Sequence, residues 1–130
     1  MSTREREKAN RRKQARKEAP PQATLTALRM SPRKIRAVAD RIEGMTVAHA
    51  LSTLAFSLRA AARPLRKLIS SAIANAETRG GVDLDELTVA KVQVDGGPTA
   101  RRYMPRAMGR ATRIRKRTSH VTVFLGTKGA

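Results

Sequence analysis

The sequence predicts an α+β fold: a small three-stranded antiparallel sheet packed against three helices, with a long protruding basic β-hairpin and a basic N-terminal arm. Two segments, residues 87–95 and 120–125, alternate apolar and polar residues with the period of a strand. Residues 96–117 between them hold eight Arg and Lys residues and no acidic residue. Three helical patterns between residues 31 and 80 supply a layer that covers the sheet.

The charge-rich segment of residues 1–22 comes first, and we expect it to be a basic extension that precedes a single globular domain of residues 23–130. It has almost no apolar periodicity and stops at Pro20 and Pro21. Two interpretations stay open: a disordered, solvated tail, or an arm that becomes ordered, as a helix, along a row of phosphates. The basic residues of this segment that we expect to contact phosphates are Arg11, Arg12, Lys13, Arg16 and Lys17.

Residues 23–28 alternate weakly and predict a short first strand. Ser31 and Pro32 then predict the start of a helix, because Ser is a favoured N-cap and Pro at the first helical position lacks an N–H that would have no partner anyway. Gly44 is placed to end this helix. Its expected buried face consists of Ile35, Val38, Ala39 and Ile42.

Two further helices are predicted between residues 46 and 80. Thr46 is a suitable N-cap for a short helix, and Gly80 and Gly81 are placed to end a longer one. Pro64 lies either in the first turn of the longer helix or at a kink in a helix that begins near Arg59, and the sequence is compatible with both. The expected buried residues are Val47, Ala50, Leu51 and Leu54 in the short helix and Leu65, Leu68, Ile69, Ala72, Ile73 and Ala76 in the long one.

The composition points to a polyanionic partner. Lys and Arg number 28 against 10 Asp and Glu in 130 residues, which gives a formal net charge of +18. Such self-repulsion destabilises an isolated compact fold, whereas phosphates that neutralise the charge release condensed counterions. The absence of cysteine excludes disulfides, thiolate metal sites and cysteine nucleophiles. Since no segment resembles a transmembrane helix or a secretory signal, we expect a soluble cytoplasmic protein that does not bind membranes.

The sequence offers no constellation for catalysis, and we expect no enzyme, no metal and no cofactor. Asp83, Asp85 and Glu86 form the one candidate for carboxylate chemistry, but neighbouring residues on a loop rarely converge on one ion. Ser119 and His120 are adjacent on a predicted strand, where successive side chains point to opposite faces, so they do not form a nucleophile and its base. We expect His120 to be structural.

The basic hairpin, at about residues 95–118, is the expected binding element. At about 3.3 Å per residue, roughly eleven residues on each side would reach roughly 35 Å beyond the sheet. Its few apolar side chains bury too little surface to hold it, so we expect most of it to be disordered in the free protein and ordered by RNA. The planar guanidinium of Arg suits bidentate phosphate contacts. The expected RNA-binding residues are Arg101, Arg102, Arg106, Arg110, Arg113, Arg115, Lys116 and Arg117.

Secondary phosphate contacts are expected from Ser31, Arg33 and Lys34 at the start of the first predicted helix. One alternative remains open, and a second fails. An architectural DNA-binding protein with a β-ribbon arm would dimerise and insert an apolar wedge, for which Met104 and Pro105 are suitable. An RNA-processing enzyme would need convergent carboxylates or a usable histidine, which the sequence does not offer.

Four motifs follow one another along the chain: SPRKIRAVAD at residues 31–40, SAIANAE at 71–77, VDGGP at 94–98 and MPRAMGRATRIRKRTSHVTV at 104–123. Together they resemble the bacterial type of the family of large ribosomal subunit protein twenty-two, from about residue 23 to residue 125. Most bacterial members of that family begin close to the first strand, so residues 1–22 are an extension relative to them.

The resemblance implies a structural constituent of the large ribosomal subunit that binds 23S ribosomal RNA, contacts neighbouring ribosomal proteins and aids assembly. It also implies that the hairpin runs inward through the RNA and helps to line the exit tunnel, where it would meet the nascent polypeptide. We expect no homo-oligomer. The tip that faces the tunnel would comprise Met104, Arg106, Met108, Gly109 and Arg110; of these, Met108 stands where the family commonly has a basic residue.

Overall fold

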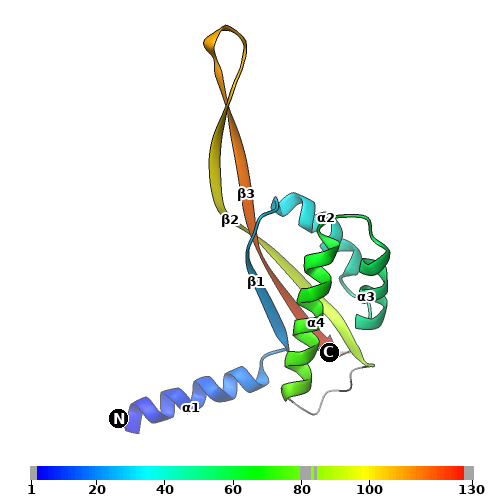
Figure 1. Cartoon of the computed structure of the whole chain (residues 1–130). Helices are drawn as coiled ribbons and strands as arrows, with labels where there is room; N and C mark the ends of the chain where they lie inside the picture. Colours follow the sequence, from blue (N-terminus) through cyan, green and yellow to red (C-terminus); the bar gives the residue numbers. More distant parts are fainter. Residues whose placement is uncertain (1–2, 80–82, 84, 128–130) are drawn as a thin grey trace.

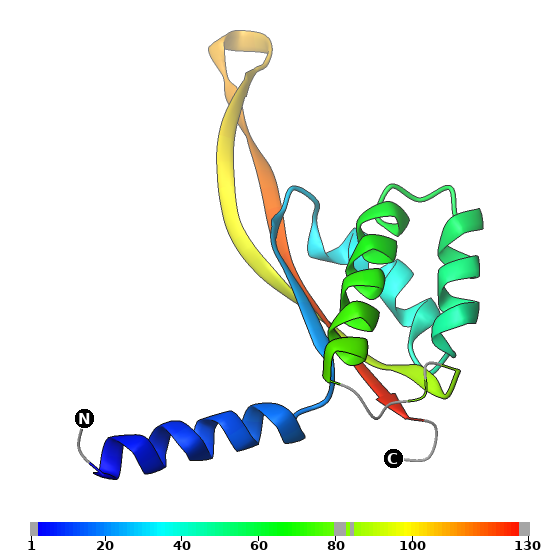
Figure 2. The same cartoon turned by 60° about the horizontal axis from the view of Figure 1, so that its bottom comes forward.

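The computed structural model describes residues 3–79, 83 and 85–127, whose arrangement Figure 1 shows. The described elements, in chain order, are α1 (Thr3–Glu18), β1 (Gln22–Leu28), α2 (Pro32–Ile42), α3 (Val47–Phe56), α4 (Ala62–Arg79), β2 (Leu87–Pro105), one 3-10 turn (Ala107–Gly109) and β3 (Ala111–Thr127). Helices α2, α3 and α4 lie on one side of the sheet, whereas α1 projects away from the body (Figure 2).

The sheet is antiparallel, with the strand order β1-β3-β2, so that β3 is its central strand. The pairing of β3 with β1 ends at Leu28 and Ser119, but its pairing with β2 continues to Pro105 and Ala111. Beyond Ser119 the two longer strands therefore leave the body as a two-stranded ribbon (Figure 1). The predicted α+β fold, with three helices covering a three-stranded antiparallel sheet, is confirmed.

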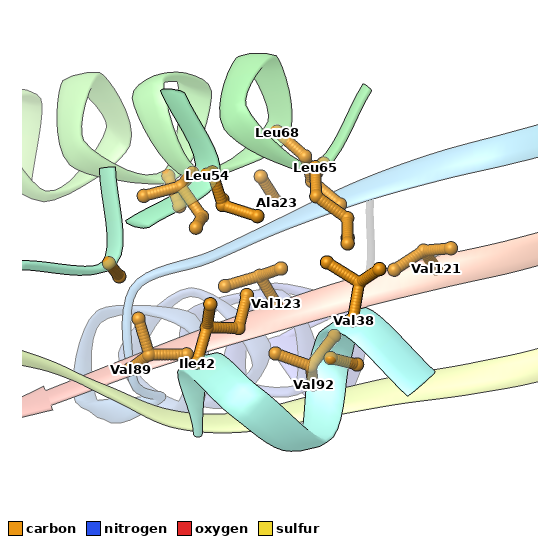
Figure 3. Packing of buried hydrophobic residues seen from close by; sticks show 14 of the residues in the cluster. Ala23, Val38, Ile42, Leu54, Leu65, Leu68, Val89, Val92, Val121 and Val123 are labelled. Carbon is orange, nitrogen blue, oxygen red and sulfur yellow. The ribbon is translucent and has the colours of Figure 1, made fainter. Parts of the chain in front are cut away.

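The core lies between the sheet and the three covering helices, and Figure 3 shows part of it. The predicted buried face of α2 is confirmed. In α3 and α4, Leu51 and Ile73 are only partly buried, because they lie at the margin of the core. The hydrophobic residues with no exposed surface are Ile35, Ile42, Ala50, Ile69, Ala72, Ala76, Val89, Val121, Val123 and Leu125.

The predicted ends of the helices are largely as expected. Ser31 is the N-cap of α2, although its hydroxyl makes no capping hydrogen bond, and Pro32 is the first helical residue. Gly44 follows the C-cap with a φ of +79°, a left-handed conformation that favours glycine, and its N–H donates to the Val89 carbonyl at 2.8 Å. Pro64 lies near the start of α4, so the first-turn alternative is correct. The predicted stop at residues 80 and 81 lies outside the described residues.

Helix α1 corresponds to the helical alternative for the N-terminal segment. Its sequence, TREREKANRRKQARKE, is rich in good helix formers but has no apolar stripe, so local propensity and not packing accounts for it. The linker that follows is attached to α4, since Arg79 donates to the Ala19 carbonyl and Asn75 donates to the Gln22 carbonyl at 2.9 Å. The C-terminal end of α1 is therefore anchored to the body through this linker, and the rest of the helix projects away from the body (Figure 2).

Strands β2 and β3 are much longer than the segments 87–95 and 120–125 that the apolar alternation predicts. The backbone ladder continues through residues 99–105 and 111–117, where basic residues are interspersed with small, polar and apolar ones. An apolar period of two marks a strand with one buried face. No residue of these two segments is buried, so the same backbone conformation has no such signal in the sequence.

Candidate nucleic-acid interface

The ribbon beyond the body, which we call the arm, comprises residues 99–117 and closes in a tight turn. Its strands pair without interruption from Thr99 and Arg117 to Pro105 and Ala111. At the turn the Arg106 N–H donates to the Arg110 carbonyl at 2.7 Å. Met108 and Gly109 adopt positive φ values of 58° and 66°, which reverse the chain direction. The arm is thus a regular hairpin with a defined apex.

The side chains of the arm are available to a partner. None of them is buried, and Ile114 alone is half-buried. Apolar side chains are also uncovered: Tyr103 is 66% exposed, Met104 43% and Met108 92%. The eight predicted RNA-binding cations all lie on this hairpin or its turn, seven of them arginines. A surface that combines high positive charge with uncovered apolar groups is unlike an ordinary solvated loop.

The register gives the arm two different faces. Directly paired residues project to the same face of a ribbon, and the next pair projects to the opposite one. One face, which we call the arginine face, carries Arg101, Tyr103, Arg113, Arg115 and Arg117. The other, which we call the mixed face, carries Ala100, Arg102, Met104, Thr112, Ile114 and Lys116. On the arginine face the Arg113 guanidinium lies 6.0 Å from the centroid of the Tyr103 ring.

The predicted tip residues divide between the turn and the ladder. Arg106, Met108, Gly109 and Arg110 lie in the turn. Met104 pairs with Thr112 and therefore lies on the ladder just before it. The Nε of Arg106 donates to the Thr112 hydroxyl at 2.9 Å, which draws this guanidinium back along the arm.

A glycine-rich bulge joins the arm to the body. The register shifts between Gly96 and Thr99, which places a β-bulge at Gly-Gly-Pro. The Thr118 hydroxyl donates to the Pro98 carbonyl at 2.6 Å. A Cβ added to Gly97 would lie 2.5 Å from this hydroxyl oxygen, so only glycine fits beside it. The bulge is therefore fixed from both strands.

The residues that the sequence offers as candidates for catalysis make structural contacts. The hydroxyl of the fully buried Ser119 donates to the Met30 carbonyl at 2.6 Å. His120 accepts the Ala27 N–H through Nδ1 at 3.1 Å, at an irregularity in the pairing of β1. In the acidic loop, Asp83 accepts the Asp85 N–H at 3.1 Å, which makes a local turn. Across the described residues no group of His, Asp and Glu has the geometry of a metal site.

The secondary cations occupy two separate places. Arg33 and Lys34 are exposed in the first turn of α2 beside the half-buried Ser31, close to the base of the arm. Arg11 and Arg12 are exposed on α1, which lies at the opposite end of the body from the arm (Figures 1 and 2). The side chains of Lys13, Arg16 and Lys17 lie outside the described residues. The structure therefore does not bring the α1 cations together with those of the arm.

Two further cations approach the base of the arm. A groove of about 690 Å³ brings Arg29, from the β1–α2 connection, and Arg59, from the α3–α4 connection, beside Arg115. Arg29 could not be predicted from the sequence as part of the interface, since no neighbouring residue distinguishes it from other surface arginines. Arg59 is identifiable in the sequence only as a member of a basic helical surface.

An exposed basic arm on a small α+β body is typical of a protein that binds nucleic acid. In the part of the chain that the structure describes, no helix is long and apolar enough to span a membrane. The sequence was then compared with known proteins. Residues 23–126 match the model of the family described as Ribosomal protein L22p/L17e.

Relatives named large ribosomal subunit protein uL22 match most of the chain. The protein from Anaeromyxobacter sp. (strain Fw109-5) is 58% identical over 108 residues, which cover 82% of this chain and 75% of that protein. The protein from Myxococcus xanthus is 58% identical over 105 residues, covering 79% of this chain and 92% of its own. The protein from Geobacter sulfurreducens is 52% identical over 106 residues, which cover 82% of this chain and 96% of that protein.

The chain belongs to the L22p/L17e family of ribosomal proteins. It is a structural, non-enzymatic protein of the large subunit of the cytoplasmic ribosome, as the sequence motifs predict. The family match begins at residue 23, so that α1 lies outside it.

Proposed function

We propose that this protein binds large-subunit (23S) ribosomal RNA through its arm and helps to hold RNA segments together during assembly of the subunit. The supporting observation is the arm itself, in which eight basic residues occur without an acidic one and no side chain is buried. Phosphates neutralise such charge and release counterions, which provides affinity. The fixed shape of the hairpin provides specificity, because folded RNA is recognised largely by its shape.

The turn of the arm is proposed to help line the nascent-peptide exit tunnel and to meet the nascent polypeptide there. Membership of the family and the exposure of Met108 at the apex support this role. Arg106, Gly109 and Arg110 would share the turn, with Met104 next to it on the ladder. Because Met108 is uncharged and unbranched, it would present an apolar contact at the apex of the arm.

Secondary contacts with the RNA are proposed for Ser31, Arg33 and Lys34 at the base of the arm. Helix α1 is proposed to reach a separate stretch of RNA, since it lies at the other end of the body (Figure 1). The residues of α1 concerned are Arg11, Arg12, Lys13, Arg16 and Lys17. In the subunit the protein would act as one copy beside other ribosomal proteins, without forming a homo-oligomer.

The alternative of a DNA-binding arm has less support. In this alternative Met104 and Pro105 would form an apolar wedge at the tip of the arm. Pro105 ends β2 and Met104 pairs with Thr112, so both lie on the flank of the hairpin. A dimer in solution that prefers duplex DNA to ribosomal RNA would favour this alternative.

Sedimentation of a cell lysate on sucrose gradients at moderate and then at high salt tests the proposal. We expect the protein to co-sediment with the large subunit at both salt concentrations, because an embedded arm resists the screening that removes surface contacts. A variant in which a two-residue Asn-Gly turn replaces residues 100–116 should dissociate at high salt. The matched control, a deletion of residues 1–18, should stay bound. Loss of the intact protein at high salt would overturn the embedded-arm proposal.

A further inference from the structure

We infer that the connection between α3 and α4 is a surface through which this protein binds a neighbouring ribosomal protein of the large subunit. The segment of the partner that fits there carries one large apolar side chain with aspartate or glutamate residues beside it. We call this surface, which comprises residues 53–66 and the adjoining Arg41, the corner. The inference rests on the proposed function, because it takes the protein to be assembled into the large subunit.

The corner exposes large apolar side chains that do not contribute to the core. Phe56, the last residue of α3, is 88% exposed, and Leu58 in the connection is fully exposed. Among the described residues, the other exposed large hydrophobic side chains are those of Tyr103, Met104 and Met108, which lie on the hairpin. The body therefore leaves two such side chains uncovered at one place, where a partner that covered them would gain affinity.

Two open grooves at the corner share Leu58 in their lining. The first, of about 450 Å³, is lined at its floor by Val38, Ile42 and Leu54, core residues that Figure 3 shows. The second, of about 510 Å³, lies on the α4 side and is lined in part by Ala62. A groove with an aliphatic floor favours an apolar side chain of a protein over the sugar and phosphate groups of RNA.

The rims of both grooves are positively charged. Arg41 and Arg59 line the first groove, and Arg59, Arg63 and Arg66 line the second. These four arginines are exposed, and they are the only ionisable residues in the two linings. The sequence has no acidic residue from 44 to 76, so α3 and the connection supply no carboxylate to neutralise them. A partner that covers the apolar side chains must therefore bring carboxylates, since burying unpaired charges at an interface is costly.

The position of the corner favours a partner inside the subunit. Arg59 and Ala60 also line the groove of about 690 Å³ at the base of the arm, together with Arg115. The corner therefore lies at the end of the body from which the arm extends, and not at the end that carries α1 (Figure 1). Because the arm is proposed to be embedded in the subunit, this end of the body faces the other components of the subunit.

A base of RNA stacked on Phe56 is the competing occupant, since arginines beside an aromatic ring are also typical of surfaces that bind RNA. Leu58 favours the protein partner, because it is as exposed as Phe56 but has no ring on which a base can stack. Both occupants are anionic, so the total charge of the corner does not distinguish them. A probe that reacts with whichever molecule covers position 56 does.

Photocross-linking in the assembled subunit provides this test. Large subunits are purified from cells whose full-length chain carries benzoylphenylalanine in place of Phe56, and they are irradiated. We expect a product with one ribosomal protein, in which the cross-linked peptide contains a large apolar residue beside Asp or Glu. The same probe in place of Ser52 is the control and should not give this product, because Ser52 is exposed on α3 but lines neither groove.

A matched pair on α4 tests the role of charge. Arg66 lines the second groove, whereas the neighbouring Lys67 is exposed but lines neither. With the probe at position 56, we expect Arg66→Glu to lower the yield of the protein product about fivefold or more, because it places a carboxylate beside those of the partner. Lys67→Glu makes the same change in charge but should lower the yield less than about twofold, since solvent screens a charge outside the interface. Unchanged unfolding midpoints provide the folding control at these exposed positions.

The outcomes separate the inference from the function on which it rests. A product with 23S ribosomal RNA or with a second copy of this chain, a peptide without carboxylates, or no product would overturn the inference. Equal losses for Arg66→Glu and Lys67→Glu would overturn the charge complementarity on which it depends. In each of these cases the proposed function stands as long as the protein co-sediments with the large subunit. If the unaltered protein does not co-sediment with it, the proposed function fails, and the inference fails with it.

Discussion

Strands β2 and β3 run through both the body and the arm, but the side chains on one face of their ladder are buried in the body and exposed in the arm. In the body, alternate residues such as Val92, Val94, Val121 and Val123 are buried against the helices. In the arm, the positions that continue this series on the same face hold Arg101, Tyr103 and the three arginines of β3. Helices cover one face of the first region, and none of the described elements covers the second (Figure 1). The arm therefore presents as a ligand-binding face what is elsewhere a core face.

Side chains of the body contribute more to the free energy of folding than side chains of the arm. Each fully buried aliphatic side chain of the body contributes about 1.5–3 kcal/mol. A cross-strand pair in the arm contributes about 0.2–1 kcal/mol, and a two-stranded hairpin is marginally stable at best in water. We therefore expect the body to fold by itself, whereas most of the arm is disordered in the free protein and its ladder is stabilised by RNA.

The largest difference in stability between the body and the arm should appear when one isoleucine in each region is replaced by alanine. Ile69 is fully buried in α4, and Ile114 is the half-buried residue of the arm. We expect Ile69→Ala to lower the free energy of unfolding by about 2–5 kcal/mol, because it leaves a cavity. Ile114→Ala should change it by less than about 0.5 kcal/mol. Urea unfolding followed by circular dichroism measures both; a comparable loss for Ile114→Ala would mean that the arm folds as part of the body.

The bulge between the regions should be the next most sensitive feature. Gly97→Ala places a Cβ 2.5 Å from the Thr118 hydroxyl oxygen and 3.1 Å from the His120 Nε2. We expect a loss of about 1–3 kcal/mol in the free energy of unfolding, as for other overpacked sites. Gly96→Ala is the control, because a Cβ there meets no atom within 4 Å.

Both glycine variants should be measured by urea unfolding and by binding to 23S ribosomal RNA. Gly97→Ala is expected to weaken binding as well, since the arm can relieve the clash by changing its direction relative to the body. If Gly96→Ala has the larger effect on either measurement, the bulge does not fix the arm in the way that its contacts indicate.

Much of the body could be predicted from the sequence because its signals are local. The stripe of Ile35, Val38, Ala39 and Ile42, the Ser-Pro start of α2 and the glycine after it each specify a helix or its end within a few residues. The cations of the arm were also identifiable, since a run of one charge stands out in any composition. These predictions needed no knowledge of which residues meet in space.

The organisation of the interface could not be predicted in the same way. The two faces of the arm depend on a one-residue shift in register at Gly97, which a motif alone does not reveal. The convergence of Arg29 and Arg59 on Arg115 depends on how two loops pack beside the sheet. Apolar alternation marks only the parts of β2 and β3 that lie in the body, because it reports burial and the arm is not buried; the hairpin at about residues 95–118 was predicted from its charge and its place between two strands.

The smallest effect should come from the one aromatic contact within the arm. Tyr103 lies directly opposite Arg113, with the guanidinium 6.0 Å from the ring centroid. At an exposed site such a contact contributes about 0.5 kcal/mol, which is negligible for the body. In a marginally stable ladder the same free energy changes the ratio of paired to open states about twofold, which is measurable because both states are populated.

We therefore expect Tyr103→Leu to reduce the population of the paired arm in the free protein without changing the body. Met104→Leu, at the neighbouring position on the mixed face, is the control and should leave that population unchanged. Amide chemical shifts of residues 99–105 and 111–117 report the population, and those of the body report its integrity. A change in chemical shift confined to the arm would support the view that the arm and the body fold independently. If the body shifts changed equally, the two regions would form one cooperative unit, and RNA would not be needed to stabilise the arm.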